Sequence, residues 1–193
     1  MATTPSATSS PASPLKERAS EMGKFVLGLA EEGERSAVVL GASRADALLE
    51  ELLRTALKRH PGGSDNLFDP DRPLGTFSAR IALAFRMGVI DDSCEHALQM
   101  LRKIRNDFAH SSSRATLSES RHRSRVVELV REAKKVGKHY DKMDLWFDKC
   151  DPTLRSFCAA VSVVLSRLDF AAIDAKQVEP PFTASLRDFE KES

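Results

Sequence analysis

The fold is decided by residues 38–57, VVLGASRADALLEELLRTAL. Apolar residues recur in this stretch every three or four positions, which is the period of an amphipathic α-helix rather than of a β-strand. The sequence HPGG at residues 60–63 ends the pattern, because proline and glycine are poor helix formers. The stretch therefore predicts one long helix whose apolar face other helices must cover.

The helical period returns in other parts of the chain. It predicts further helices near residues 25–29, 74–88, 91–108, 118–138 and 152–170. Asp71 and Pro73 suit the entry of the helix at 74–88, and Asp91 and Asp92 suit the start of the helix at 91–108. Since no segment alternates with the period of a strand, we expect an all-α, single-domain helical bundle of six or seven helices.

The bundle is expected to span residues 15–172, with a tail on each side. Residues 1–14, MATTPSATSSPASP, carry almost nothing apolar to bury, so we expect a disordered N-terminal tail. In residues 173–193, the pair Pro180-Pro181 breaks any helix and leaves Phe182, Leu186 and Phe189 as the side chains able to dock. We therefore expect an extended C-terminal tail.

Charge and cysteine content narrow the classes of function. The net charge is +1, which gives no general attraction to nucleic acid or to an anionic membrane surface. Cys94, Cys150 and Cys158 are widely spaced among apolar neighbours, which favours buried, reduced thiols over a disulfide framework or a zinc site. With no signal-peptide pattern, and no apolar run expected to reach the roughly 18 residues of a membrane span, the sequence predicts a cytoplasmic protein that does not contact membranes.

The stretch LRKIRNDFAHSSS at residues 101–113 concentrates polar groups at the end of a predicted helix. At about 100° per residue, Arg105 falls within about 60° of the centre of the stripe defined by Leu101 and Phe108. A guanidinium held near a core needs a carboxylate, carbonyls or an anion. One interpretation is therefore purely structural, with Asp46 or Glu51 of the long helix as the partner.

Residues 71–110, DRPLGTFSARIALAFRMGVIDDSCEHALQMLRKIRNDFAH, resemble the core signature of the mannitol operon repressor family. Three blocks carry the resemblance in order and spacing, namely LGTFSARI, MGVI and IRNDFAH. It implies an all-helical bacterial transcriptional regulator without a helix-turn-helix of its own, which acts through protein partners. That is the leading functional hypothesis.

The last block is also similar to the R-x4-6-H motif of HEPN domains, which are helical, commonly dimeric, and in many cases metal-independent ribonucleases. The resemblance implies that His110 moves a proton of the ribose or of the leaving oxygen, that Arg105 stabilises charge on phosphorus, and that Asn106 orients either group. Neither a metal nor a cofactor is expected. A ribonuclease or RNA-binding module is therefore the alternative hypothesis, and a homodimer is expected in either case.

Geometry restricts how Arg105 and His110 could share one site. Five residues along a regular helix turn the two side chains about 140° apart. Either the helix ends near Phe108 and the chain turns His110 back, or the arginine of one chain meets the histidine of a second across a two-fold axis.

A basic segment follows this motif. Residues 114–142 carry nine Lys and Arg against four Asp and Glu, a local net charge of +5. The candidate residues for binding RNA or a protein partner are Arg102, Asp107, Arg121, Arg123 and Arg125. The other interpretation is an exposed helix whose charges only keep it soluble.

The remaining chemistry-bearing residues show no ligand spacing. His60, His96, His122 and His139 are scattered, so each is expected to be a surface or capping histidine, and no metal site is predicted. Trp146 is expected to pack in the structure rather than stack on a ligand.

Overall fold

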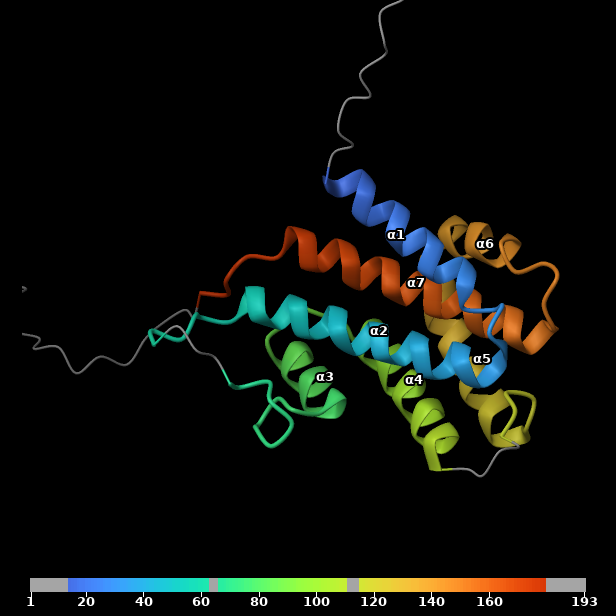
Figure 1. The fold of residues 1–193 in the computed structure, drawn as a ribbon, viewed down its shortest axis with the longest axis horizontal. Coiled ribbons are helices and arrows are strands. Elements are labelled where there is room, and N and C mark those ends of the chain that lie inside the picture. The colour runs from blue at the N-terminus through green and yellow to red at the C-terminus, as the bar shows by residue number, and fades with distance from the viewer. Residues whose placement is uncertain (1–13, 63–65, 111–114, 180–193) are drawn as a thin grey trace, which may run out of the picture.

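The computed structural model describes residues 14–62, 66–110 and 115–179. Within these ranges the chain forms seven α-helices and no strand (Figure 1). They are α1 (Pro14–Gly28), α2 (Gly33–Ala56), α3 (Phe77–Arg86), α4 (Asp92–His110), α5 (Ser120–Lys134), α6 (Lys138–Leu145) and α7 (Pro152–Asp174). The prediction of an all-α bundle with six or seven helices is confirmed.

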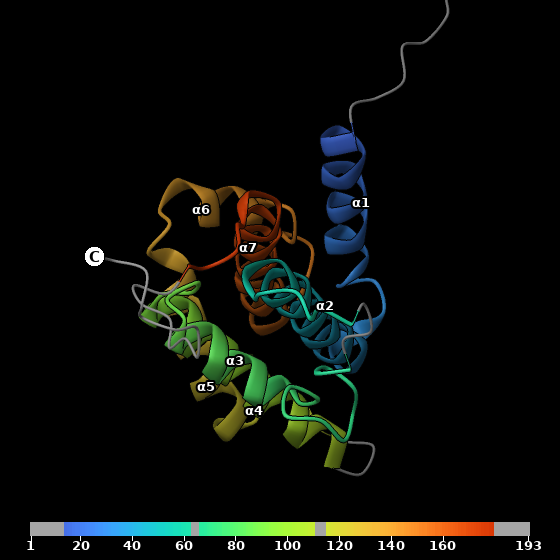
Figure 2. The same cartoon turned by 90° about the vertical axis from the view of Figure 1, so that its left-hand side faces the viewer.

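The core is enclosed by α2, α4, α5 and α7, each of which packs against at least two of the others. α3 packs against α2 and α4. α7 lies between α1 on one side and α6 on the other (Figure 2). The centre of α7 is buried on all sides, and Phe157, Val161 and Leu165 are fully enclosed. At Gly41 of α2, a Cβ atom would lie 2.9 Å from a methyl group of Val161, so this glycine permits the close approach of α2 and α7.

The apolar character of α7 was underestimated from the sequence. The helix is long and apolar enough to cross a membrane by length and composition alone, contrary to the expectation that no run approaches that length. However, 67% of its most apolar window is buried inside the bundle. Burial of this extent is typical of the core helix of a globular domain.

Several helix boundaries differ from those predicted. α3 begins at Phe77 rather than beside Asp71 and Pro73, because the hydroxyl of Thr76 accepts a hydrogen bond from the amide of Ala79 and caps the helix. The helix expected at 118–138 ends early, because α5 stops at Lys134 and the separate helix α6 begins at Lys138 after Gly137, whose φ of 59° favours glycine.

The last helix continues to Asp174, two residues into the predicted C-terminal tail. Residues 175–179 follow without helix, and the amide of Val178 donates a hydrogen bond to the carbonyl of Ala56 at 2.8 Å. The remainder of that predicted tail, and residues 1–13 of the N-terminal one, lie outside the described residues.

Candidate functional site

α4 carries the predicted motif and is regular to its end. The side chain of Asp91 accepts a hydrogen bond from the amide of Cys94 at 2.8 Å and caps the helix start, as predicted. Ile104 and Phe108 are buried in the predicted stripe. Because the helix runs to His110, the expectation that it could end near Phe108 and turn His110 back is wrong. Within one chain, Arg105 and His110 therefore point about 140° apart.

Arg105 is half-buried, but it does not reach the carboxylates proposed for it. Its guanidinium donates to the side-chain oxygen of Asn106 at 3.1 Å. Among the described residues, Asp46 pairs with Arg80, and Glu51 pairs with Arg18. The structural interpretation of Arg105 is therefore wrong in its choice of partners. The long side chain keeps part of its surface exposed, so its charge does not require a carboxylate partner.

His110 is exposed and lies at an open, polar depression of about 450 Å³. The side chains that line the depression are Asp107, His110, Glu119, Arg121 and His122. Two of the predicted binding residues thus lie beside His110, but Arg105 and Asn106 do not. One chain does not assemble the three residues proposed as catalytic.

Asp107 is the centre of an ion-pair cluster that joins α4 to α5. Its carboxylate lies 2.5 Å from the guanidinium of Arg125 and 3.5 Å from that of Arg121. Burial disfavours the charged form of Asp107, but hydrogen bonds from Arg125 and Arg121 outweigh burial and lower the pKa of this carboxyl below its ordinary value. Arg125 also donates to the backbone carbonyl of Lys103. Three of the predicted binding residues therefore hold the two helices together.

His122 was expected at the surface, and this expectation is wrong. The residue is 3% exposed, and its ring packs on Phe108 with 5.0 Å between ring centroids. Its Nδ1 lies 2.7 Å from the carbonyl of Thr116, so Nδ1 donates that hydrogen bond, while Nε2 faces Asp107 at 3.4 Å. The signal was present in the sequence, because His122 precedes Val126 and Leu129 at helical spacing on the buried face of α5.

The other predicted binding residues do not converge on the depression. Arg102 donates to the side chain of Gln99, and Arg123 is exposed on α5. Elsewhere in the basic segment, Arg131 and Lys135 both pair with buried Glu132. Since internal carboxylates offset several of its cations, the segment offers less free positive charge to a phosphate backbone than its sequence indicated.

Among the described residues, the buried arginine is Arg80, which was not predicted from the sequence. Its guanidinium pairs with Asp46 at 2.7 Å and with Glu50 at 2.8 Å. It also donates to the backbone carbonyls of Leu74 and Phe68. Each nitrogen of the guanidinium thus has a hydrogen-bond partner, and these bonds hold the loop before α3 against α2.

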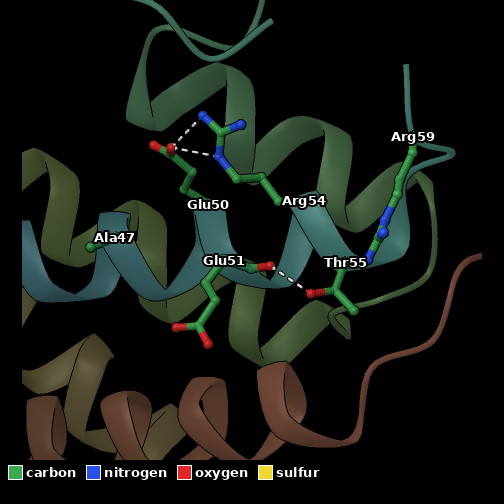
Figure 3. Close-up of a pocket in the computed structure, with 6 residues that line it drawn as sticks. All are labelled: Ala47, Glu50, Glu51, Arg54, Thr55 and Arg59. Atoms are coloured by element: carbon green, nitrogen blue, oxygen red, sulfur yellow. Dashed lines mark hydrogen bonds and ion pairs between the residues drawn. The ribbon is translucent and has the colours of Figure 1, made fainter. Parts of the chain in front are cut away.

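Two neighbouring carboxylates of α2, Glu50 and Glu51, point to opposite sides of the helix. Figure 3 shows Glu50 bonded to Arg54 on one side of α2, whereas Glu51 points to the other side. There Glu51 accepts two hydrogen bonds from Arg18 of α1, which also pairs with Asp169 of α7. Three of the four charged residues that line the depression in Figure 3, namely Glu50, Glu51 and Arg54, therefore already have partners in the fold.

An apolar groove of about 490 Å³ lies between α1, α6 and α7. Large hydrophobic side chains in it remain exposed, with Trp146 at 47%, Phe170 at 60% and Ile173 at 37%. Leu15 of α1, 58% exposed, extends the groove toward the N-terminal end of that helix. The expectation that Trp146 is packed away is therefore wrong. A sequence signal existed, because α7 is apolar around more of its circumference than one buried stripe requires.

The cysteines and the other potential metal ligands form no further site among the described residues. Cys94, Cys150 and Cys158 are free, with Cys158 buried and the other two half-buried. Burial raises the pKa of the Cys94 thiol and that of the Cys158 thiol to about 12, which leaves both groups protonated and poorly nucleophilic at neutral pH. No group of three metal-binding side chains occurs among the described residues.

Comparison with known proteins identifies no relative. No family model, no curated protein and no solved structure matches the chain. The likeness to mannitol operon repressors and to HEPN domains accordingly stays a prediction that rests on residues 71–110.

Proposed function

We propose that the chain is a cytoplasmic regulatory protein that acts through protein–protein contacts and uses the groove of α1, α6 and α7 as its binding surface. It influences transcription through a bound partner, as the likeness to mannitol operon repressors implies. The observation that carries the proposal is the cluster of exposed Trp146, Phe170 and Ile173 in one groove. Contiguous exposed apolar surface of this kind marks sites of protein interaction.

The shape and chemistry of the groove fit one kind of partner. Apolar side chains from three helices line a groove, and charged Asp169 and Asp174 lie in it. An amphipathic helix presents apolar anchors at intervals of three and four residues and binds such grooves through them. Aromatic residues are also enriched where binding energy concentrates. The proposal therefore assigns Trp146 and Phe170 as the principal contacts.

A photo-crosslinking amino acid at position 170 tests the proposal in the cells that produce the protein. The matched control carries the same amino acid at position 127, because Val127 is 59% exposed on α5 and does not line the groove. We expect a discrete protein adduct from position 170 and none from position 127. Adducts of equal yield at both positions, or none at position 170, would contradict the proposal.

The second candidate is a HEPN-type ribonuclease built by a homodimer, in which Arg105 of one chain meets His110 of the other. The observation in its favour is that exposed His110 lies in an open depression beside Arg121. Incubation of the purified protein with RNA in EDTA tests it, because this chemistry needs no metal. Cleavage that His110→Ala and Arg105→Ala both abolish would support the candidate, and intact RNA at several protein concentrations would exclude it.

A further inference from the structure

We propose that residues 182–189 of the same chain occupy the groove of α1, α6 and α7 in the resting protein and compete there with the partner. The inference rests on the proposed function, and it adds how that function is regulated. Removal of the segment from the groove exposes Trp146, Phe170 and Ile173, which are the surface that the partner needs.

The chemistry of the chain selects this segment as the occupant. Residues 1–13 contain no large hydrophobic residue after the initial methionine, so they cannot fill an apolar groove. The sequence FTASLRDF at 182–189 places Phe182, Leu186 and Phe189 at intervals of four and three residues. This spacing puts all three on one face of a helix, which is the pattern that helix-binding grooves recognise.

The reach of the chain allows the contact. Asp174, at the end of α7, lines the groove, and the hydrogen bond of Val178 to Ala56 holds the chain four residues later. Four residues separate these two Cα atoms by at most about 14 Å, and the four extended residues from Val178 to Phe182 can span about the same distance back. A helix that begins at Phe182 extends about 10 Å further to Phe189, so its apolar face can lie along the groove beside Asp174 without any change in α7.

Because residues 182–189 belong to the same chain as the groove, they can occupy it even if they bind weakly. A short flexible connection gives an effective concentration on the order of 1 mM, so a segment that binds with a Kd of about 0.1 mM would occupy the groove in about nine chains of ten. A partner must then displace the segment, which lowers the partner's apparent affinity about tenfold. Loss of the three apolar anchors removes that competition.

Trp146 provides the test, because it is the one tryptophan in the sequence and it lies in the groove. Quenching of its fluorescence by acrylamide is measured in the full chain and in the full-length variant Phe182→Ala/Leu186→Ala/Phe189→Ala. We expect the accessible fraction of Trp146 to rise about tenfold in the variant, with emission at longer wavelength. A synthetic peptide of residues 180–193, added to the variant, should restore protection and saturate. The same peptide with its three anchors changed to alanine should not.

Three results would overturn the inference. They are equal quenching in the full chain and the variant, failure of the peptide to protect Trp146, and protection that declines on dilution, which would place the segment in a neighbouring chain. Circular dichroism of the variant establishes that the bundle is intact. Crosslinking from position 170 reports on the partner independently, so a partner adduct with unchanged Trp146 quenching would refute the tail contact and leave the proposed function standing.

Discussion

Arg80 and Arg105 lie in similar positions on their helices and end in opposite environments. By helical phase, Arg105 lies about 50° and Arg80 about 70° from the centre of the apolar stripe of its helix. Arg80 is 8% exposed and pairs with Asp46 and Glu50, whereas half-buried Arg105 bonds only to its neighbour Asn106 among the described residues. Phase along one helix therefore predicts which face a charge occupies. The partner that the charge meets depends on another element.

The three blocks that resemble mannitol operon repressors all have roles inside the fold. In the block LGTFSARI, the residues Leu74, Thr76 and Arg80 fasten a loop or cap a helix. In the block MGVI, Gly88 adopts a φ of 69° after α3. In the block IRNDFAH, Phe108 is buried and Asp107 joins α4 to α5. Each block thus has a structural role that needs no bound ligand.

The largest effect is expected where the buried arginine is removed. Arg80→Met leaves Asp46 and two carbonyls without their donor and leaves Glu50 paired with Arg54 alone, so we expect the free energy of unfolding to fall by about 3 kcal/mol. Urea denaturation of the variant measures the change. The matched control is Arg105→Met, for which we expect a change within about 0.5 kcal/mol. An equal decrease in the free energy of unfolding in the two variants would contradict the different roles assigned to Arg80 and Arg105.

A second substitution tests the loop that Arg80 fastens. At Gly75, a Cβ atom would lie 2.3 Å from the carbonyl oxygen of Asp69 and 2.4 Å from that of Pro70. Because backbone atoms cannot move aside cheaply, we expect Gly75→Ala to lower the free energy of unfolding by about 2 kcal/mol. Gly23→Ala is the control, since nothing lies within 4 Å of a Cβ atom there. Thermal melts that do not separate the two variants would contradict the loop geometry.

A smaller and pH-dependent effect is expected at the α4–α5 cluster. The pKa of Asp107 is lower in the folded chain than its ordinary value. Its pairing therefore stabilises the fold fully above the unfolded pKa near 4, and the stabilisation is lost as pH falls through the folded pKa. Asp107→Asn should cost about 1 kcal/mol at pH 7, and the difference from wild type should shrink toward pH 3. Denaturation at both pH values checks the sign, and a difference that grows on acidification would contradict it.

The smallest effect on stability is expected at His110 of the R-x4-6-H motif. His110 is exposed at the end of α4, so His110→Ala should change the free energy of unfolding by no more than about 0.5 kcal/mol. Calorimetry at neutral pH measures it. A loss comparable with that of Asp107→Asn would show that His110 belongs to the ion-pair cluster.

The helices were predictable because their apolar period is local information, and Leu101 and Phe108, which define the predicted stripe of α4, are both buried. The pairing of Arg80 with Asp46 and Glu50 was not predictable, because these residues lie thirty or more positions apart in the sequence. The burial of His122 and the division at Gly137 left signals in the sequence, namely helical spacing with Val126 and a glycine inside a helical pattern. The apolar circumference of α7 was a signal of the groove, but the exposure of Trp146 could not be predicted, because it depends on how α1 and α6 lie against α7.

We propose that the protein acts through the groove of α1, α6 and α7 rather than through His110 of one chain. The most direct measurement compares transcript levels in cells that carry Phe170→Asp, His110→Ala or the control Val127→Asp in place of the wild-type protein. Phe170 and Val127 are 60% and 59% exposed, so the two charged substitutions should be tolerated equally by the fold. We predict that Phe170→Asp reproduces the transcript changes of a deletion while the other two resemble wild type. The reverse result, with His110→Ala matching the deletion and Phe170→Asp matching wild type, would contradict the account.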